Sequence, residues 1–205
     1  MKLNSDQSDV LAEVVNIGVG RAAASLSELI GMRIEIVVPT VKVLNPREAA
    51  HLLGQDDSTS ISQEFSGIVS GRAALVFPQG SGIALAKLLT DRTEAVAEFD
   101  IELSGVLTEV GNIVLNCIMG TLANMLDTRL EYTVPQFSTV SIIREFLLKS
   151  DTASGEATGD VLIADAQFRV SQRDISGSLI TVFELGSIEH MLQILLREEA
   201  PQSNH

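Results

Sequence analysis

The chain repeats itself, and this repeat constrains its fold more than any other feature. The segment EVVNI that begins at Glu13 reappears as EVGNI at Glu109, 96 residues later. A proline follows each asparagine of these segments by 23 residues, at Pro39 and at Pro135. Later matches, such as Ser70-Gly71 with Ser176-Gly177, have an offset of 106 residues, so the second half is about ten residues longer. Two similar halves must adopt similar folds and bury their apolar faces together.

Each half predicts the same order of elements. A long helix (residues 9–30 and 102–126) precedes a strand that ends near the proline (33–38 and 129–134). A further strand, two β-rich runs typical of a hairpin and an amphipathic helix (81–89 and 187–197) complete each half. We also expect a short helix after Pro46 in the first half only.

Polar stretches predict linkers at residues 54–60, 91–100 and 150–160, and the extra residues of the second half fall in the last of these. The halves, about 9–91 and 102–198, would pair their sheets around a pseudo-two-fold axis. The expected fold is therefore a single α/β domain over residues 1–200, with a central β-sheet packed by the long helices. A disordered tail is expected at 201–205.

Composition excludes several classes of function. A net charge of −13 argues against binding to nucleic acid and to anionic membranes, which both require an excess of Lys and Arg. The single cysteine, Cys117, cannot form an internal disulfide, and no Cys/His cluster has the spacing of a zinc site. The most apolar stretch, 106–126, carries one glutamate and three asparagines, which a membrane span tolerates poorly. With no apolar leader segment at the start, we expect a cytoplasmic protein without membrane insertion.

In each long helix a glutamate and an asparagine lie three residues apart and so share one face. The opposite face of the first helix is predicted to be buried (Leu11, Val14, Gly18, Ala22, Leu26 and Leu29). Small or polar residues continue the stripes that carry the pairs (Asp9, Gly20 and Ala23 or Ser27; Gly105, Asn116 and Ala123). We therefore expect both pairs, Glu13 with Asn16 and Glu109 with Asn112, to be exposed.

These residue types suit phosphoryl transfer to water. No Ser/His/Asp or Cys/His set supplies a covalent nucleophile. An amide can hold a water molecule by donating and accepting hydrogen bonds, and a carboxylate beside it can bind a lysine or a cation of a partner. The plainer interpretation is a solvated helix face copied by duplication. Both residues persist in each half while their neighbours have diverged, which favours a role in catalysis.

With these residues the chain resembles the CheC/FliY/CheX family of phosphatases, and CheC in particular, because it has two copies of the motif. That motif is an acidic or serine residue, three residues, Glu, two residues, Asn, and a proline about twenty residues later. The matching positions are Asp9, Glu13, Asn16 and Pro39 in the first copy, and Glu109, Asn112 and Pro135 in the second. The resemblance implies hydrolysis of the aspartyl phosphate of a CheY-type response regulator in bacterial chemotaxis.

The same resemblance implies a role for each residue. Glu13 and Glu109 would pair with the active-site lysine of phosphorylated CheY, while Asn16 and Asn112 would orient the attacking water. The Mg²⁺ ion would belong to the partner, so the protein would need no cofactor or metal of its own. The receptor deamidase CheD is a second candidate partner.

Some positions depart from the family pattern. Gly105 stands where the second motif expects an acidic or serine residue, although Ser104 is adjacent, and Val15 replaces the glycine usual between Glu and Asn. We interpret Gly111 as a small residue that lets the partner settle close to the helix, and expect Arg21 to draw Glu13 away from the partner's lysine. Both features predict that the second site is the stronger.

Two other functions compete with the phosphatase. Residues 18–23 fit the dinucleotide fingerprint G-x-G-x-x-A, but the matching stretch of the second half has no such glycines and reads as helix, so we reject that site. The serious alternative is a non-catalytic binding or scaffold module related to the middle domain of FliM. Acceleration of phosphate release from a phosphorylated receiver would distinguish an enzyme from a scaffold.

Overall fold

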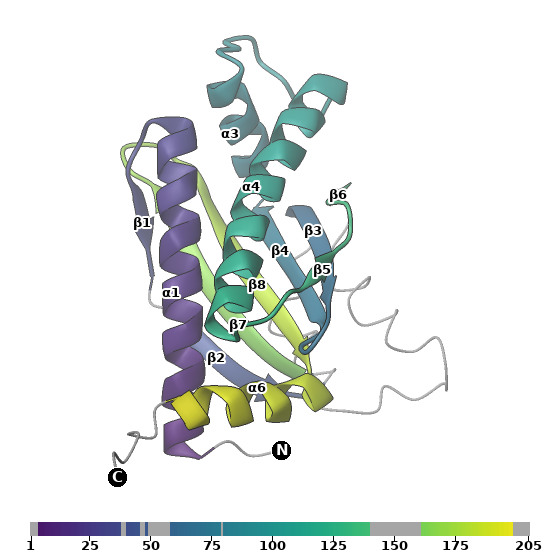
Figure 1. The fold of residues 1–205 in the computed structure, drawn as a ribbon. Coiled ribbons are helices and arrows are strands. Elements are labelled where there is room, and N and C mark those ends of the chain that lie inside the picture. The colour runs from purple at the N-terminus through teal and green to yellow at the C-terminus, as the bar shows by residue number, and fades with distance from the viewer. Residues whose placement is uncertain are drawn as a thin grey trace.

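The computed structural model describes residues 4–37, 40–45, 48, 58–78, 80–139 and 161–198. Helices and strands follow one another in the predicted order (Figure 1). The helices are α1 (Ser5–Ile30), α3 (Ser81–Leu89), α4 (Ile101–Met125) and α6 (Leu185–Glu198). The strands of the first half are β1 (Ile34–Ile36), β2 (Thr40–Leu44), β3 (Ser58–Ser66) and β4 (Gly71–Pro78). Those of the second half are β5 (Glu131–Tyr132), β6 (Gln136–Ser138), β7 (Val161–Val170) and β8 (Ser176–Glu184).

Side-chain caps start both long helices. Asn4 Oδ1 accepts a hydrogen bond from the Gln7 backbone N–H at 2.8 Å, and Gln7 Oε1 accepts one from the Asn4 N–H at 3.0 Å. This capping box satisfies two backbone donors, which explains why α1 begins earlier than residue 9. Asp100 caps α4 by accepting from the Leu103 N–H at 2.8 Å.

The strands form one antiparallel sheet in the order β1-β7-β8-β4-β3-β5, with β2 also paired to β7 and β6 to β3. The halves therefore exchange strands: β1 and β2 extend β7 of the second half, and β5 and β6 extend β3 of the first. At the centre of the sheet, Ala74 of β4 faces Ile180 of β8, its counterpart 106 residues later. This register places a local two-fold relation between β4 and β8, as the repeat predicted. The duplication of the sequence remains an interpretation.

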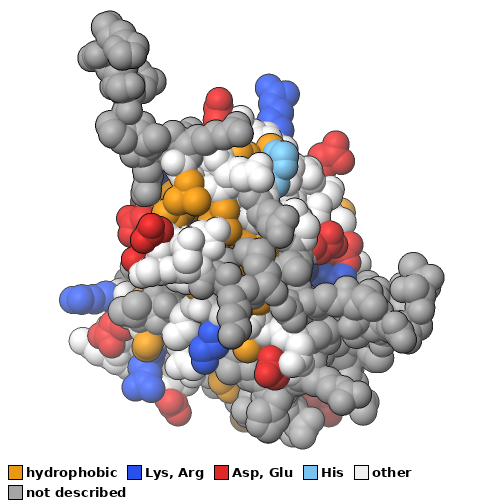
Figure 2. Space-filling model, turned by 90° about the horizontal axis from the view of Figure 1, so that it is seen from below, with side chains coloured by type: hydrophobic (Ala, Val, Ile, Leu, Met, Phe, Trp, Pro, Cys, Tyr) orange, Lys and Arg blue, Asp and Glu red, His pale blue; other side chains and the backbone are white. Residues whose placement is uncertain are grey.

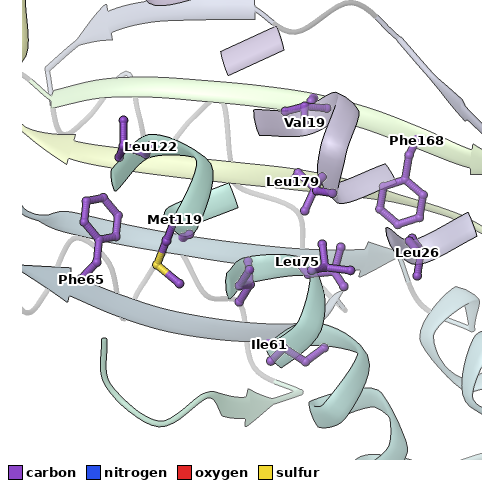
Figure 3. Packing of buried hydrophobic residues seen from close by; sticks show 14 of the residues in the cluster. Val19, Leu26, Ile61, Phe65, Leu75, Met119, Leu122, Phe168 and Leu179 are labelled. Carbon is purple, nitrogen blue, oxygen red and sulfur yellow. The ribbon is translucent and has the colours of Figure 1, made fainter. Parts of the chain in front are cut away.

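The core lies between the sheet and the two long helices, which run side by side across one of its faces (Figure 1). Figure 3 shows side chains of α1 and α4 directed at those of the strands. The labelled residues are Val19, Leu26, Met119 and Leu122 from the helices, and Ile61, Phe65, Leu75, Phe168 and Leu179 from the strands. The predicted fold class, an α/β domain whose central sheet is packed by long helices, is confirmed.

Three expectations about burial are wrong. Leu29 lies in the last turn of α1, where its side chain is 39% exposed instead of buried. Ala123, assigned to the polar stripe of α4, belongs to the core cluster. The linker predicted at residues 54–60 overlaps β3, in which Ser58, Thr59 and Ser60 are buried. Small hydroxyl side chains fit a packed strand as readily as a loop, so their composition misled the prediction.

Helix α6 lies across one end of the helix pair and covers the core there with Ile188, Met191, Leu192 and Leu195. Figure 2 views the molecule from this end. Acidic and basic side chains are interspersed over the part of the surface drawn in colour. The described residues therefore show no single-sign patch on this face that would attract a charged polymer.

By length and hydropathy alone, α1 and α4 could each cross a membrane. Of the most apolar window in each helix, 44% and 50% respectively are buried inside the fold. Core helices of globular proteins pass the same test, so this is weak evidence for a span.

Some predictions concern residues outside the described part of the chain. These are Pro39, the insertion within 150–160, the tail at 201–205 and the short helix after Pro46. At the predicted start of that segment, Asn45 Oδ1 accepts from the Glu48 N–H and the Glu48 carboxylate accepts from the Asn45 N–H, each at 3.0 Å. This reciprocal pair has the form of a capping box.

Candidate active site

Both predicted pairs lie on the long helices, on the side turned away from the sheet. Glu13 and Asn16 of α1 are exposed, as is Glu109 of α4, whereas Asn112 is half-buried. Residues three apart on a helix have Cβ atoms about 5–6 Å from each other, so each glutamate neighbours its asparagine. The expected exposure is confirmed for Glu13, Asn16 and Glu109, whereas Asn112 is more enclosed than predicted.

The opposite faces of the helices explain this orientation. The buried residues of α1 recur at helical spacing and pack on the sheet (Leu11, Val14, Gly18, Ala22 and Leu26). Those of α4 do the same (Leu103, Leu107, Val110, Val114 and Leu115). Because Gly18, Val19 and Gly20 all lie within the unbroken helix α1, the dinucleotide fingerprint forms no loop, and its rejection is confirmed.

The two helices run antiparallel, so the two pairs are far apart. Arg21 Nη1 of α1 donates to Thr121 Oγ1 of α4 at 3.5 Å, and Ser25 Oγ donates to Cys117 Sγ at 3.6 Å. The two helices therefore cross between these two contacts, between Arg21 and Ser25 on α1 and between Cys117 and Thr121 on α4. Asn16 and Asn112 each precede that point by about seven residues, so roughly 20 Å of helix separates them at 1.5 Å per residue. The structure does not bring the pairs into one site but forms two.

The contact of Arg21 corrects one prediction. We expected this guanidinium to attract Glu13 within α1, yet it reaches across to α4 instead. Glu13 forms no ion pair among the described residues. Its carboxylate is therefore available to a partner.

The position of Gly111 corrects another. A Cβ atom built on Gly111 would lie 2.6 Å from Ile61 Cβ, which is closer than real side chains approach. Gly111 thus faces β3 and lets α4 lie directly on the sheet, instead of opening the surface to a partner. Val15, its counterpart in α1, is half-buried against the same core. Because Gly111 and Val15 both face the core, their difference in size cannot make one site more accessible than the other.

The second site has a hydrogen bond that the first lacks. Asn116 Nδ2 donates to Asn112 Oδ1 at 2.9 Å along one turn of α4. The side chains of Glu13, Asn16 and Glu109 have no hydrogen-bond or ion-pair partner within the described part of the chain. Sequence reasoning placed Asn116 on the same stripe but did not predict the bond.

The surroundings of the two sites also differ. Ile101, 93% exposed, lies on the stripe of Glu109 two turns earlier, and a Cβ built on Gly105 between them would meet nothing within 4 Å. The hydroxyl of the adjacent Ser104 donates to the Asp100 carbonyl at 2.8 Å. Beside the first site, Ser5 takes the place of Ile101 and Asp9 that of Gly105, whereas Asp6 corresponds to the acidic Glu102. The second site is therefore bordered by an exposed isoleucine where the first site has a serine.

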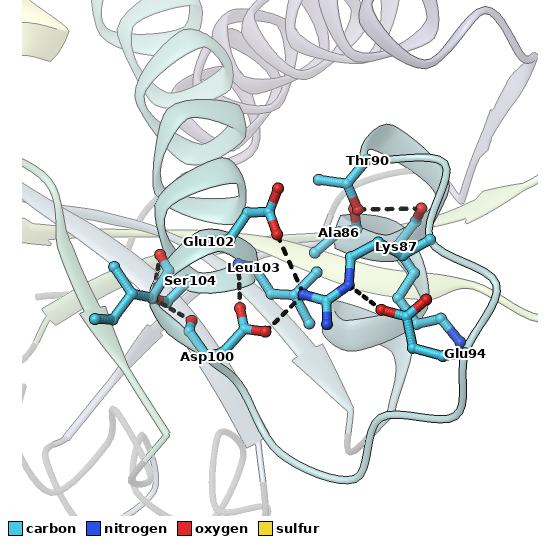
Figure 4. A network of polar contacts seen from close by, with 10 residues as sticks. Ala86, Lys87, Thr90, Glu94, Asp100, Glu102, Leu103 and Ser104 are labelled. Atoms are coloured by element: carbon cyan, nitrogen blue, oxygen red, sulfur yellow. Dashed lines mark hydrogen bonds and ion pairs between the residues drawn. The ribbon is translucent and has the colours of Figure 1, made fainter.

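A charged network anchors the start of α4 (Figure 4). Arg92 Nη1 contacts Asp100 Oδ2 at 2.6 Å and Glu102 Oε2 at 3.3 Å, and Arg92 Nε contacts Glu94. The Leu103 N–H, followed by the Arg92 guanidinium, holds the pKa of Asp100 below its usual value. This network ties the loop before α4 to the first turn of the helix that carries the second site.

Other candidate sites are weaker. No group of three or more His, Cys, Asp or Glu side chains among the described residues could hold a metal ion. An open cavity of about 730 Å³ near the start of α4 is lined by residues such as Phe99, Phe137 and Ile83. Neither Glu/Asn pair contributes to that cavity, so we do not assign the chemistry to it.

Comparison with known proteins shows which family this chain resembles. A sequence model of the CheC-like family matches residues 7–43, which include Glu13 and Asn16. The CheY-P phosphatase CheC of Bacillus subtilis (strain 168) is 28% identical over 145 residues, which are 66% of this chain and 68% of that protein. The resemblance to the CheC-like family is confirmed.

Solved structures extend the likeness of fold over nearly the whole chain. FliY of Thermotoga maritima superposes with a TM-score of 0.76 at 19% identity, covering 97% of this chain and all of that one. The FliM middle domain of H. pylori gives a TM-score of 0.66 at 11% identity, covering 93% of this chain and 99% of its own. At sequence identities this low, the solved structures show that the fold is shared, but they do not establish the activity of this chain. The comparisons therefore show a resemblance to CheC-like proteins and a shared fold.

Proposed function

We propose that this protein is a phosphatase that hydrolyses the aspartyl phosphate of a CheY-type response regulator. The observation that carries the proposal is that both Glu/Asn pairs lie on accessible helix faces, side by side within each pair. Similarity to the CheY-P phosphatase of Bacillus subtilis supports the choice of substrate.

Each pair would act by positioning. The carboxylate of Glu13 or Glu109 would bind the ammonium group of a lysine beside the phosphorylated aspartate of the receiver. The amide of Asn16 or Asn112 would hold a water molecule in line with the bond between phosphorus and the aspartyl oxygen. The water oxygen would attack phosphorus, the aspartate would leave as a carboxylate, and inorganic phosphate would carry away the protons of the water.

This mechanism requires no covalent intermediate on the protein. Holding reactants in a productive geometry can account for several orders of magnitude in rate, and phosphoryl transfer depends chiefly on such positioning and on neutralising charge. The Mg²⁺ ion that neutralises charge on the phosphoryl group would belong to the receiver. We propose no cofactor for this chain, a cytoplasmic location suited to its substrate, and CheD as a second candidate partner.

A scaffold function is the second candidate, and the likeness to the FliM middle domain favours it. The two proposals differ in one measurable respect. A scaffold would bind receivers without shortening the lifetime of the aspartyl phosphate, whereas an enzyme would shorten it catalytically.

The test is release of inorganic phosphate from each purified, phosphorylated receiver of the same organism, at substoichiometric amounts of this protein. Multiple turnovers with at least one receiver are expected. Stable binding with unchanged phosphate lifetimes for every receiver would instead establish the scaffold.

A further inference from the structure

The hydrogen bond between Asn116 and Asn112 determines which way the Asn112 amide faces. An asparagine amide can turn about its last torsion to exchange its oxygen and nitrogen. Here Asn112 Oδ1 accepts from Asn116 Nδ2 at 2.9 Å, so the oxygen points along α4 toward Asn116. The Asn112 amino group then faces away from that turn. The oxygen keeps a second lone pair with which it can accept from a water molecule.

The first site lacks this constraint. Gly20 occupies the place one turn after Asn16, as Asn116 does after Asn112. Gly20 is exposed, and a side chain built there would meet no atom within 4 Å. The Asn16 amide has no hydrogen-bond partner in the described part of the chain, so it is free to rotate.

Helix stability does not explain Asn116. Asparagine is a poorer helix former than alanine, because its side chain competes for backbone hydrogen bonds. A polar pair at this spacing on a helix surface stabilises only slightly. Asn116 therefore contributes little to the stability of the helix, yet it is hydrogen-bonded to the amide of the second site. This combination indicates a role in that site.

We propose that Asn116 is a positioning residue that fixes the Asn112 amide in the orientation needed to hold the attacking water. This inference rests on the proposed phosphatase function. Because the amide is already oriented, the second site does not lose that rotational freedom when it binds water and receiver. Freezing one such side chain corresponds to roughly two- to tenfold in rate. The second site is then the stronger one, for a reason other than the size of Gly111.

The test isolates the second site in a chain carrying Asn16→Ala. Asn116→Ala removes the donor while improving helix propensity. Asn116→Asp keeps the size, but its carboxylate can only accept hydrogen bonds and would turn the Asn112 amide around. We expect kcat to fall about two- to tenfold in Asn116→Ala and further in Asn116→Asp, with KM unchanged and no loss of melting temperature in Asn116→Ala.

The converse experiment uses the first site in a chain carrying Asn112→Ala. Gly20→Asn should raise kcat by a similar factor, whereas the matched control Gly20→Ala, which stabilises the helix without an amide, should not. NMR supplies a readout independent of activity: the side-chain NH₂ resonances of Asn116 should shift in Asn112→Ala.

The outcomes separate the two proposals. A wild-type chain that dephosphorylates no receiver would refute the proposed function and this inference with it. If the wild type is active, either of two results would refute the inference alone. One is full kcat in both Asn116 variants; the other is unchanged side-chain NH₂ chemical shifts of Asn116 in Asn112→Ala.

Discussion

Replacing Gly111 with alanine tests whether its small size serves the core or the partner. A Cβ atom at this position would lie 2.6 Å from Ile61 Cβ, and Ile61 is fully buried in β3. Since α4 cannot withdraw without loosening the core, the added methyl group should cost about 1–3 kcal/mol through overpacking. The better helix propensity of alanine offsets about 1 kcal/mol of this. We expect a net destabilisation of up to about 2 kcal/mol.

Gly120 supplies the matched control. It lies in the same helix, and a Cβ built there would meet nothing within 4 Å. Gly120→Ala should therefore stabilise the protein by about 0.5–1 kcal/mol. Chemical denaturation measures both variants, and 1 kcal/mol corresponds to a shift of about 2–4 °C in Tm for a chain of this size.

A second substitution identifies the clash. Ile61→Ala removes the side chain that the new methyl group would meet, so the double variant should lose less stability than the two single variants together. Gly111→Ala as stable as Gly120→Ala would refute the packing argument. It would restore the interpretation that Gly111 serves the approach of a partner.

Three further predictions concern the surroundings of the sites. The pKa of Asp100 is lowered in the folded state, so its helix cap and its ion pair with Arg92 stabilise the fold fully at pH values above the ordinary pKa of 3.8. This stabilisation is lost as the pH falls through the lowered pKa. Asp100→Asn should keep the cap but lose this part of the acid dependence of Tm. Ile101→Ser, assayed in a chain whose first site is disabled, should raise KM about fivefold and leave kcat unchanged. The reason is that docking of the receiver would bury roughly half of the isoleucine side chain, which contributes ~1 kcal/mol to binding. An unchanged KM would exclude Ile101 from the surface that contacts the receiver. Arg21→Ala should leave kcat of the first site unchanged within about twofold, because its guanidinium contacts Thr121; a marked rise would restore its predicted competition for the lysine-binding carboxylate.

Sequence reasoning succeeded where local periodicity determines the outcome. The 3.6-residue spacing of apolar side chains in α1 and α4 determines which face is buried, so the exposure of Glu13 and Glu109 could be predicted. The repeat predicted the order of elements, because equal patterns of Gly, Pro and β-branched residues favour equal structures. Asp100 and the Asn4/Gln7 pair carry the sequence signals of helix starts, and these signals would have placed both boundaries more accurately.

Interactions between elements could not be derived in this way. That Gly111 faces Ile61 depends on where β3 passes under α4, 50 residues away in sequence. The contact of Arg21 with Thr121 depends on the crossing of two helices. The bond of Asn116 to Asn112 is local, yet spacing alone does not distinguish a hydrogen-bonded pair from two solvated amides.

The lifetime of a phosphorylated receiver in the presence of the Asn16→Ala/Asn112→Ala double variant tests the central claim most directly. The wild-type chain should shorten that lifetime, Asn112→Ala should lose more activity than Asn16→Ala, and the double variant should fall by about 10²-fold or more while still binding the receiver. A double variant that dephosphorylates the receiver as fast as the wild type would contradict the assignment of catalysis to these residues.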